Sequence, residues 1–221
     1  MTIIVNGSNT PTAGAVGYGD GTNLAFTSAG TTGQFLSSNG SSAPSWVGAP
    51  ASAMTLISTQ TASNSANLSW TGLSGYDKYV LIYENIVAAN SGTALYMYFG
   101  YGSTPTYYSS AYYSGNNIVT GSASFVYNND NFSRFYLAGR NTNINNAAPG
   151  VSGNCFFQGF LSGNYATFEA NTFYLNSGSA SQLETSGGMQ AGSTAATTAV
   201  KIQISSGNIT SGTASLYGIS S

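Results

Sequence analysis

The sequence predicts an all-β protein in which an extended N-terminal arm is followed by a jelly-roll-like antiparallel β-sandwich head. Short segments rich in β-branched and aromatic residues recur about every ten residues from Met54 onward, and glycine, asparagine and serine separate them. No window shows the apolar period of an amphipathic helix. Before Met54 the composition changes. We therefore divide the chain into an arm over residues 1–50 and a head domain over residues 54–221.

The arm carries a single charged residue, Asp20, frequent glycine, and no apolar run longer than residues 2–5. Strands are expected at residues 2–5, 23–27 and 34–37, and residues 49–53 are typical of a linker. The turn-forming pairs that separate these strands are Asn6-Gly7, Asp20-Gly21 and Asn39-Gly40.

The arm has few large apolar side chains with which to stabilise itself. Ordering the backbone of one residue costs about 1–2 kcal/mol, so an arm without a core is expected to be ordered by contacts outside its own fold, with sister subunits or another platform. The assembly anchors that we expect to be buried in those contacts are Phe26, Phe35, Leu36 and Trp46.

Residues 76–101 are the stretch around which we organise the head. Residues 79–86 and 94–99 are crowded with β-branched and aromatic side chains, and the turn-prone Asn90-Ser91-Gly92 lies between them, which predicts an antiparallel hairpin. The first segment is apolar on both faces over most of its length, which is typical of a central strand. Further strands are expected at residues 54–60, 66–70, 106–113, 122–127, 132–138, 155–161, 166–175, 199–205 and 214–219.

The composition argues against nucleic acid and membrane as partners. Charged residues make up 5% of the 221 residues, against about 25% in an ordinary globular protein, and the net charge is −2 with four basic residues. Such a chain offers no positive surface for nucleic acid or for an anionic membrane. The N-terminal sequence MTIIVNGSNTP lacks the basic region of a signal peptide, so we expect neither export by the ordinary secretory signal nor a membrane anchor.

With no histidine and one cysteine, the chain cannot assemble the usual acid–base, nucleophilic and transition-metal sites. We predict no enzymatic activity and no cofactor. Cys155 lies in an apolar run and is expected to be a buried, inert thiol. The carboxylates are isolated in sequence, and we favour solvated or turn positions for each over a glycosidase pair. They are Asp20, Asp77, Glu84, Asp130, Glu169 and Glu184.

A weak calcium site is the one metal site that the sequence leaves open. Residues 128–131, NNDN, offer the oxygen ligands that Ca²⁺ prefers, but Asp130 is the only carboxylate among three amides. Runs of asparagine and aspartate are also ordinary β-turn sequences, and this is the interpretation that we favour.

Tyrosine is concentrated between residues 96 and 113, and a tyrosine ring can stack on a sugar while its hydroxyl forms hydrogen bonds. On a single strand over residues 106–113, the paired tyrosines would point to both faces, so some would be exposed or lie in an interface. We favour core packing and subunit contact over a glycan site. The candidate receptor contacts are Tyr107, Tyr108, Tyr112 and Tyr113.

Residues 30–46, GTTGQFLSSNGSSAPSW, resemble a segment of tail-fibre and other appendage proteins of bacteriophages. Residues 14–26 are similar to the sequence that precedes that segment in such proteins. Residues 204–219 resemble the closing hairpin of a β-sandwich head domain common in phage structural proteins, and residues 76–99 fit the central strands of that domain. The resemblance covers the arm and much of the head.

The resemblance implies a homotrimeric protein on the exterior of a phage particle, made in the host cytoplasm. Its arm would attach it to other virion proteins, and its head would contact the host surface, including surface glycans. We expect a short tail fibre. An arm of about fifty residues is short for a shaft, so a capsid decoration or head-fibre protein stays open. A free-standing glycan-binding module or glycan-cleaving enzyme is the more remote alternative.

Overall fold

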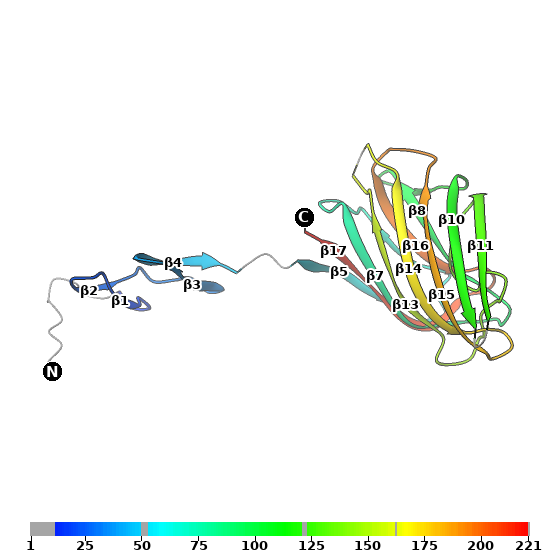
Figure 1. Ribbon diagram of the computed structural model, residues 1–221, viewed down its shortest axis with the longest axis horizontal. Coiled ribbons are helices and arrows are strands. Elements are labelled where there is room, and N and C mark those ends of the chain that lie inside the picture. Colours follow the sequence, from blue (N-terminus) through cyan, green and yellow to red (C-terminus); the bar gives the residue numbers. More distant parts are fainter. Residues whose placement is uncertain (1–11, 50–52, 121–122, 162, 221) are drawn as a thin grey trace. The chain divides into compact units, whose positions relative to one another are not determined.

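The computed structural model describes residues 12–49, 53–120, 123–161 and 163–220 (Figure 1). The described residues form strands and no helix, which confirms the all-β prediction. They fall into two compact units, the arm before residues 50–52 and the head after them. We describe each unit by itself.

The arm contains two short hairpins. In the first, β1 (Gly17–Gly19) pairs with β2 (Leu24–Phe26), and in the second, β3 (Gln34–Asn39) pairs with β4 (Ser42–Gly48). The predicted turns at Asp20-Gly21 and Asn39-Gly40 connect them. The expected strand at residues 2–5 and the pair Asn6-Gly7 lie outside the described residues.

Asp20 shows why the first arm turn closes where it does. Its Oδ1 accepts hydrogen bonds from the backbone N–H groups of Thr22, at 2.8 Å, and Asn23, at 2.6 Å. These bonds to the ionised form lower the pKa of the Asp20 carboxyl. Gly21 follows with φ of 95°, a conformation that glycine adopts readily.

The head is a sandwich of two antiparallel sheets, as predicted. The strands of the larger sheet lie side by side in Figure 1. This eight-stranded sheet has the order β11 (Ala123–Phe132), β10 (Tyr112–Thr120), β15 (Ser181–Gln190), β14 (Ala166–Leu175), β13 (Val151–Gln158), β7 (Lys78–Ala88), β17 (Ile209–Ile219), β5 (Met54–Thr61). The five-stranded sheet has the order β12 (Phe135–Ala138), β8 (Leu95–Tyr101), β16 (Thr197–Ile204), β6 (Leu68–Thr71), and β9 (Thr106–Tyr107) also pairs with β8.

The core lies between the two sheets and is rich in aromatic rings. Phe157 of β13 is fully buried, and its ring centroid lies 5.7 Å from those of Tyr79 and Phe99 and 5.0 Å from that of Phe160. Phe99 belongs to the smaller sheet, so this cluster joins the two layers. Aromatic pairs at such separations add to the stabilisation that burial itself gives.

The predicted hairpin of residues 79–86 and 94–99 is wrong. The first segment, β7, is a central strand as expected, between β13 and β17, but β8 pairs with β12 and β16 in the other sheet. Each strand has one face of buried side chains, and stacking these faces across the sandwich buries both at once. These side chains are Tyr79, Leu81 and Tyr83 on β7, and Leu95, Met97 and Phe99 on β8.

The single strand expected at residues 106–113 is also wrong. The segment splits into β9, in the smaller sheet, and the start of β10, in the larger one. Ala111, at φ of 61°, turns the chain between them. The other expected head strands each overlap an observed one, whereas β15 was not predicted.

Cys155 lies in the core, as predicted. It is fully buried, its Sγ lies 3.8 Å from Met97 Sδ of the opposite sheet, and burial raises the pKa of its thiol well above the ordinary value.

We expect the Cys155 thiol to react with Ellman's reagent only when the head unfolds, since the thiolate is the reactive form. The native chain should show no fast phase at pH 8, and in concentrated urea it should release one equivalent of product. Fast labelling of the native protein would show that the core opens at this strand.

Candidate functional site

The outer face of the larger sheet is the surface of the head with the most distinctive arrangement of side chains. One row of residues, in register, crosses every strand of the sheet. From β5 to β11 it consists of Leu56, Tyr217, Val80, Phe156, Glu169, Gly187, Gly115 and Asn128. The row is apolar over β5, β17, β7 and β13, and polar or bare over β14, β15, β10 and β11.

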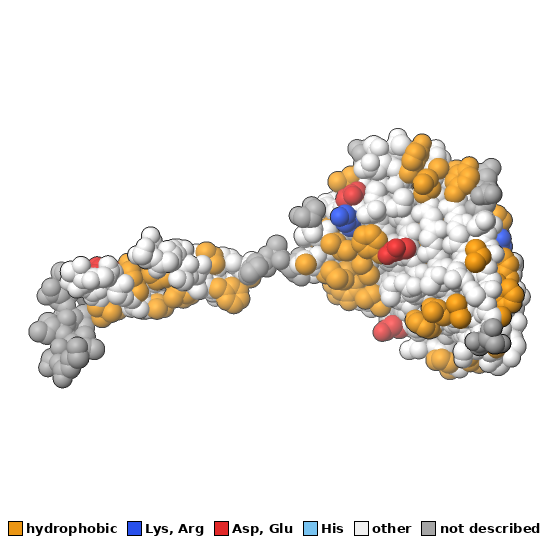
Figure 2. Space-filling model, viewed as in Figure 1, with side chains coloured by type: hydrophobic (Ala, Val, Ile, Leu, Met, Phe, Trp, Pro, Cys, Tyr) orange, Lys and Arg blue, Asp and Glu red, His pale blue; other side chains and the backbone are white. Residues whose placement is uncertain are grey.

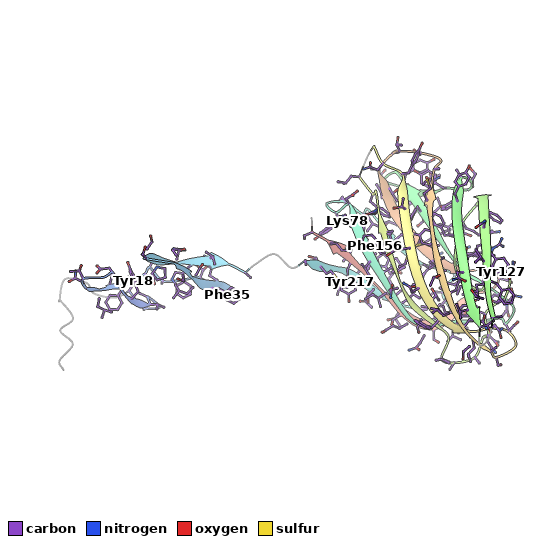
Figure 3. The ribbon with its side chains drawn as sticks, viewed as in Figure 1. Tyr18, Phe35, Lys78, Tyr127, Phe156 and Tyr217 are labelled. Atoms are coloured by element: carbon purple, nitrogen blue, oxygen red, sulfur yellow. The ribbon has the colours of Figure 1, made fainter. Side chains whose placement is uncertain are left out.

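The two halves of this face are visible in the figures. Figure 2 shows hydrophobic side chains gathered over β17 and β7, with a field of uncharged polar atoms beside them over β14, β15 and β10. Figure 3 labels Phe156 and Tyr217 in the apolar half. Leu56, at the edge of this half, is 52% exposed.

A shallow hollow of about 470 Å³ occupies the polar half. Gly187 and Gly115 are direct neighbours on β15 and β10 and form part of its floor, and Glu169 and Asn128 stand on either side of them in the row. The next row contributes Asn171, Thr185, Asn117 and Val126 to the lining.

The floor of the hollow is open because two residues lack side chains, not because the backbone is crowded there. A Cβ added at Gly187 would come no closer than 3.5 Å to another group, and one at Gly115 no closer than 3.8 Å. Gly188 is the contrast, since its Cβ would lie 2.1 Å from the carbonyl oxygen of Tyr113. Gly188 is required by the approach of two strands, whereas Gly187 and Gly115 are not.

The polar groups of the lining are almost all neutral. Asn117 and Asn171 contribute amides and Thr185 a hydroxyl, and Glu169 is the only charged residue among those that line the hollow. Asn117 Oδ1 accepts a hydrogen bond from Ser124 Oγ at 2.7 Å, which fixes the orientation of this amide. The set can form hydrogen bonds with a polyhydroxylated, uncharged molecule.

Glu184 overturns the expectation that every carboxylate is solvated or in a turn. It is fully buried on the inner face of β15. Its Oε1 accepts from Asn116 Nδ2 at 2.7 Å, and its Oε2 accepts from the Tyr174 hydroxyl and the Gly139 N–H, both at 2.9 Å. Burial raises the pKa of Glu184 to about 6, although these hydrogen bonds favour the ionised form.

The buried Glu184 carboxylate holds the chain that follows β12. The Gly139 N–H and the Arg140 N–H, at 3.4 Å, both point to Oε2, and Tyr174 links this oxygen to the Thr142 hydroxyl. The carboxylate has no contact with solvent. Its role in this arrangement is to position a loop.

The other head carboxylates whose side chains the structure describes are Asp77, Glu84 and Glu169. Asp77 Oδ1 accepts from the Leu161 N–H at 3.2 Å, and Glu84 and Glu169 are exposed. The side chain of Asp130, the candidate calcium ligand, lies outside what the structure describes. Within the described part of the chain, no three histidine, cysteine, aspartate or glutamate side chains are grouped so that they could hold a metal ion.

The four candidate receptor tyrosines do not form one surface. Tyr112 is fully buried, and its hydroxyl accepts from the Phe99 N–H at 3.0 Å and donates to the Phe99 carbonyl at 3.2 Å, so the sequence-based assignment of a surface contact to Tyr112 is wrong. Tyr107 lies on β9 in the smaller sheet, whereas Tyr113 is exposed on β10 in the larger one. Tyr108 is half-buried against Tyr101.

In the arm, no residue between 12 and 49 is buried. Phe35 is 58% exposed and pairs with the exposed Val47 on one face of the β3–β4 hairpin. Leu36, 40% exposed, pairs with Trp46 on the other face. Phe26 of β2 is half-buried.

Trp46 has a clear role inside the arm. Its Nε1 donates to the carbonyl oxygen of Ser28 at 2.8 Å. Its ring covers Gly30 so closely that a Cβ there would lie 2.6 Å from it. Trp46 therefore ties the β3–β4 hairpin to the segment that follows β2, while Phe35 is left uncovered.

In comparisons with known proteins, no family model matches the chain, and neither a curated protein nor a solved structure matches it. Nor do residues 12–49, 53–120, 123–161 and 163–220 include a helix with the length and apolar character needed to cross a membrane.

Proposed function

We propose that this protein is a non-enzymatic structural protein of a bacteriophage particle, a short tail fibre whose arm assembles and attaches it and whose head is displayed to the host surface. The observation that carries the proposal is the arm, which presents Phe35, Leu36 and Val47 to solvent and has no buried residue among those described. Such a segment needs a partner to bury these side chains.

The physical argument concerns the stability of two-stranded hairpins. A single hairpin is marginal in water, and additional strands or a packed face are needed to stabilise it. The β3–β4 hairpin has Trp46 packed on one face, while Phe35 and Val47 on the other face stay exposed among the described residues. A second and third copy of the same hairpin would supply that packing in a symmetric, closed assembly. The resemblance of residues 14–26 and 30–46 to phage appendage proteins supports a homotrimer.

The features of the head favour a role in binding over a role in catalysis. The buried carboxylate of Glu184 binds backbone and side-chain donors of its own fold. The outer sheet face of the head carries the row of residues described above, which are apolar or neutral polar apart from Glu169. We propose that the protein acts by binding and by occupying its place on the exterior of the particle.

Removing residues 1–49 tests the proposal. We expect the intact chain to sediment as a trimer and the truncated chain as a folded monomer, because the head core lies wholly within residues 53–221. The truncated chain should also fail to join particles, while circular dichroism shows an unchanged β spectrum. A truncated chain that still trimerises and joins particles would place assembly on the head and refute the division of roles.

The position of the intact chain on the particle is the second measurement. Gold labelling of a tagged chain in electron micrographs should mark the tail. Labelling over the capsid shell would refute the tail-fibre assignment and favour a decoration protein.

A further inference from the structure

We propose that the hollow over β14, β15 and β10 is a binding site for a neutral saccharide. The inference deepens the proposed function, on which it rests for the display of the head. It depends on three features of the outer sheet face: a bare floor, a neutral polar lining, and apolar side chains at both ends.

The bare floor is the first feature. Glycine inside a strand is less stable than alanine, and it often marks a place where a ligand or another backbone comes close. Another backbone does come close at Gly188, but at Gly187 and Gly115 an added Cβ would lie 3.5 Å or more from every described heavy atom beyond the adjacent residues. Alanine would fit at both positions. The two glycines therefore keep open a space that the fold itself does not use.

The lining determines the chemistry of the ligand. Asn117 and Asn171 each combine a donor and an acceptor, Thr185 adds a hydroxyl, and the Glu169 carboxylate can accept from two neighbouring hydroxyl groups. These groups match the hydroxyls of a sugar, which both donate and accept. No lysine or arginine lines the hollow, so an anionic ligand would meet Glu169 with no compensating positive charge.

Apolar side chains flank the polar groups. Phe156 pairs directly with Glu169 across β13 and β14, and Val126, 73% exposed, lies at the opposite end on β11. A pyranose ring has apolar C–H faces that pack on such side chains. The volume, about 470 Å³, lies within the range of roughly 300–1,000 Å³ that is usual for small-ligand sites.

The test measures saccharide binding to the intact protein by saturation-transfer NMR and titration calorimetry. The probes are neutral oligosaccharides of glucose, galactose, mannose and N-acetylglucosamine, with a sulfated galactose oligomer as the charged control. We expect at least one neutral probe to bind and the sulfated one to bind at least about tenfold more weakly, since Glu169 repels it.

Substitutions that alter the hollow and spare the fold locate the site. Gly187→Ala combined with Gly115→Ala should weaken binding about tenfold or more while leaving the thermal midpoint unchanged or higher. Asn171→Ala should weaken it by a similar factor through loss of hydrogen bonds. Gly178→Ala is the matched control, since it adds a methyl group at 3.4 Å from Asn176 on a loop away from the hollow, and it should leave binding unchanged.

Three results would overturn the inference: no neutral probe binds, the sulfated probe binds as well as the neutral ones, or the double glycine variant binds as tightly as the parent. The readout is saccharide affinity. Oligomeric state and particle incorporation, which test the proposed function, are measured separately, so either idea can fail while the other stands.

Discussion

Replacing Glu184 with alanine is expected to lower the free energy of unfolding of the head by about 3–5 kcal/mol. This is one of the largest losses that we expect from any single substitution in this chain. The change removes the carboxylate that accepts hydrogen bonds from the Asn116 amide, the Gly139 N–H and the Tyr174 hydroxyl. Urea unfolding followed by the fluorescence of Trp70, which is buried in the head, measures the loss.

Glu184→Gln is the matched variant, because it keeps the shape and removes the charge. One oxygen can still accept from the Gly139 N–H and the Tyr174 hydroxyl, while the new NH₂ group faces Asn116, whose amide must turn to present its oxygen. That rotation of the amide breaks the hydrogen bond from Asn116 Nδ2 to the Tyr136 carbonyl oxygen, which is 3.3 Å long. We expect a loss of about 1–2 kcal/mol. Equal losses for alanine and glutamine would show that these hydrogen bonds do not hold the loop.

The same residue makes the stability of the head depend on pH. The pKa of Glu184 is about 6 in the folded head, above its ordinary value of 4.5. Below pH 4.5 the carboxyl is protonated in both states. Between pH 4.5 and 6 the unfolded chain releases the proton first, so this group reduces stability as pH rises, by about 2 kcal/mol in all. The difference in stability between the parent and Glu184→Gln should therefore change with pH in this window and be constant above it.

The polar interior of β15 explains why the sequence did not reveal this strand. In residues 181–186, SQLETS, the usual alternation would turn Leu183 inward and Glu184 outward. The structure has the reverse, with Gln182, Glu184 and Ser186 buried. The partners of Glu184 lie on β10, on β14 and in the loop after β12, up to 68 residues away in the sequence. The local sequence pattern does not indicate such partners. Neither the strand nor the burial of its carboxylate could therefore be predicted from it.

Apolar runs with regular alternation were predicted correctly, but their pairing was not. Residues 79–86 and 94–99 were both recognised as strands, and the short connection between them suggested a hairpin. Whether two such strands pair edge to edge or stack face to face depends on what covers the buried face, and that is decided by the whole chain. The hollow was missed for a related reason, since Gly115 and Gly187 become neighbours only through the register of β10 on β15.

Substituting Phe35 with serine is expected to dissociate the assembled protein without unfolding any part of a single chain. Phe35 is 58% exposed within its own chain, so in the proposed trimer it would contribute through burial against other copies, about 2 kcal/mol for each subunit. Sedimentation over a series of protein concentrations should show trimers giving way to monomers at concentrations where the parent is fully assembled. Trp46→Ala should have the same effect and in addition loosen the arm, because Trp46 also holds Ser28 and Gly30.

Phe173→Ser is the matched control, since Phe173 lies on the outer face of β14 in the head and is 59% exposed. If the arm carries the assembly contacts, Phe173→Ser should sediment as the parent does while Phe35→Ser does not. Protease digestion separates the two arm variants further, because cleavage near Ser28 should accelerate in Trp46→Ala beyond what dissociation alone produces. Dissociation by Phe173→Ser with Phe35→Ser still assembled would place the contacts between copies on the sheet face of the head and leave the arm for attachment alone.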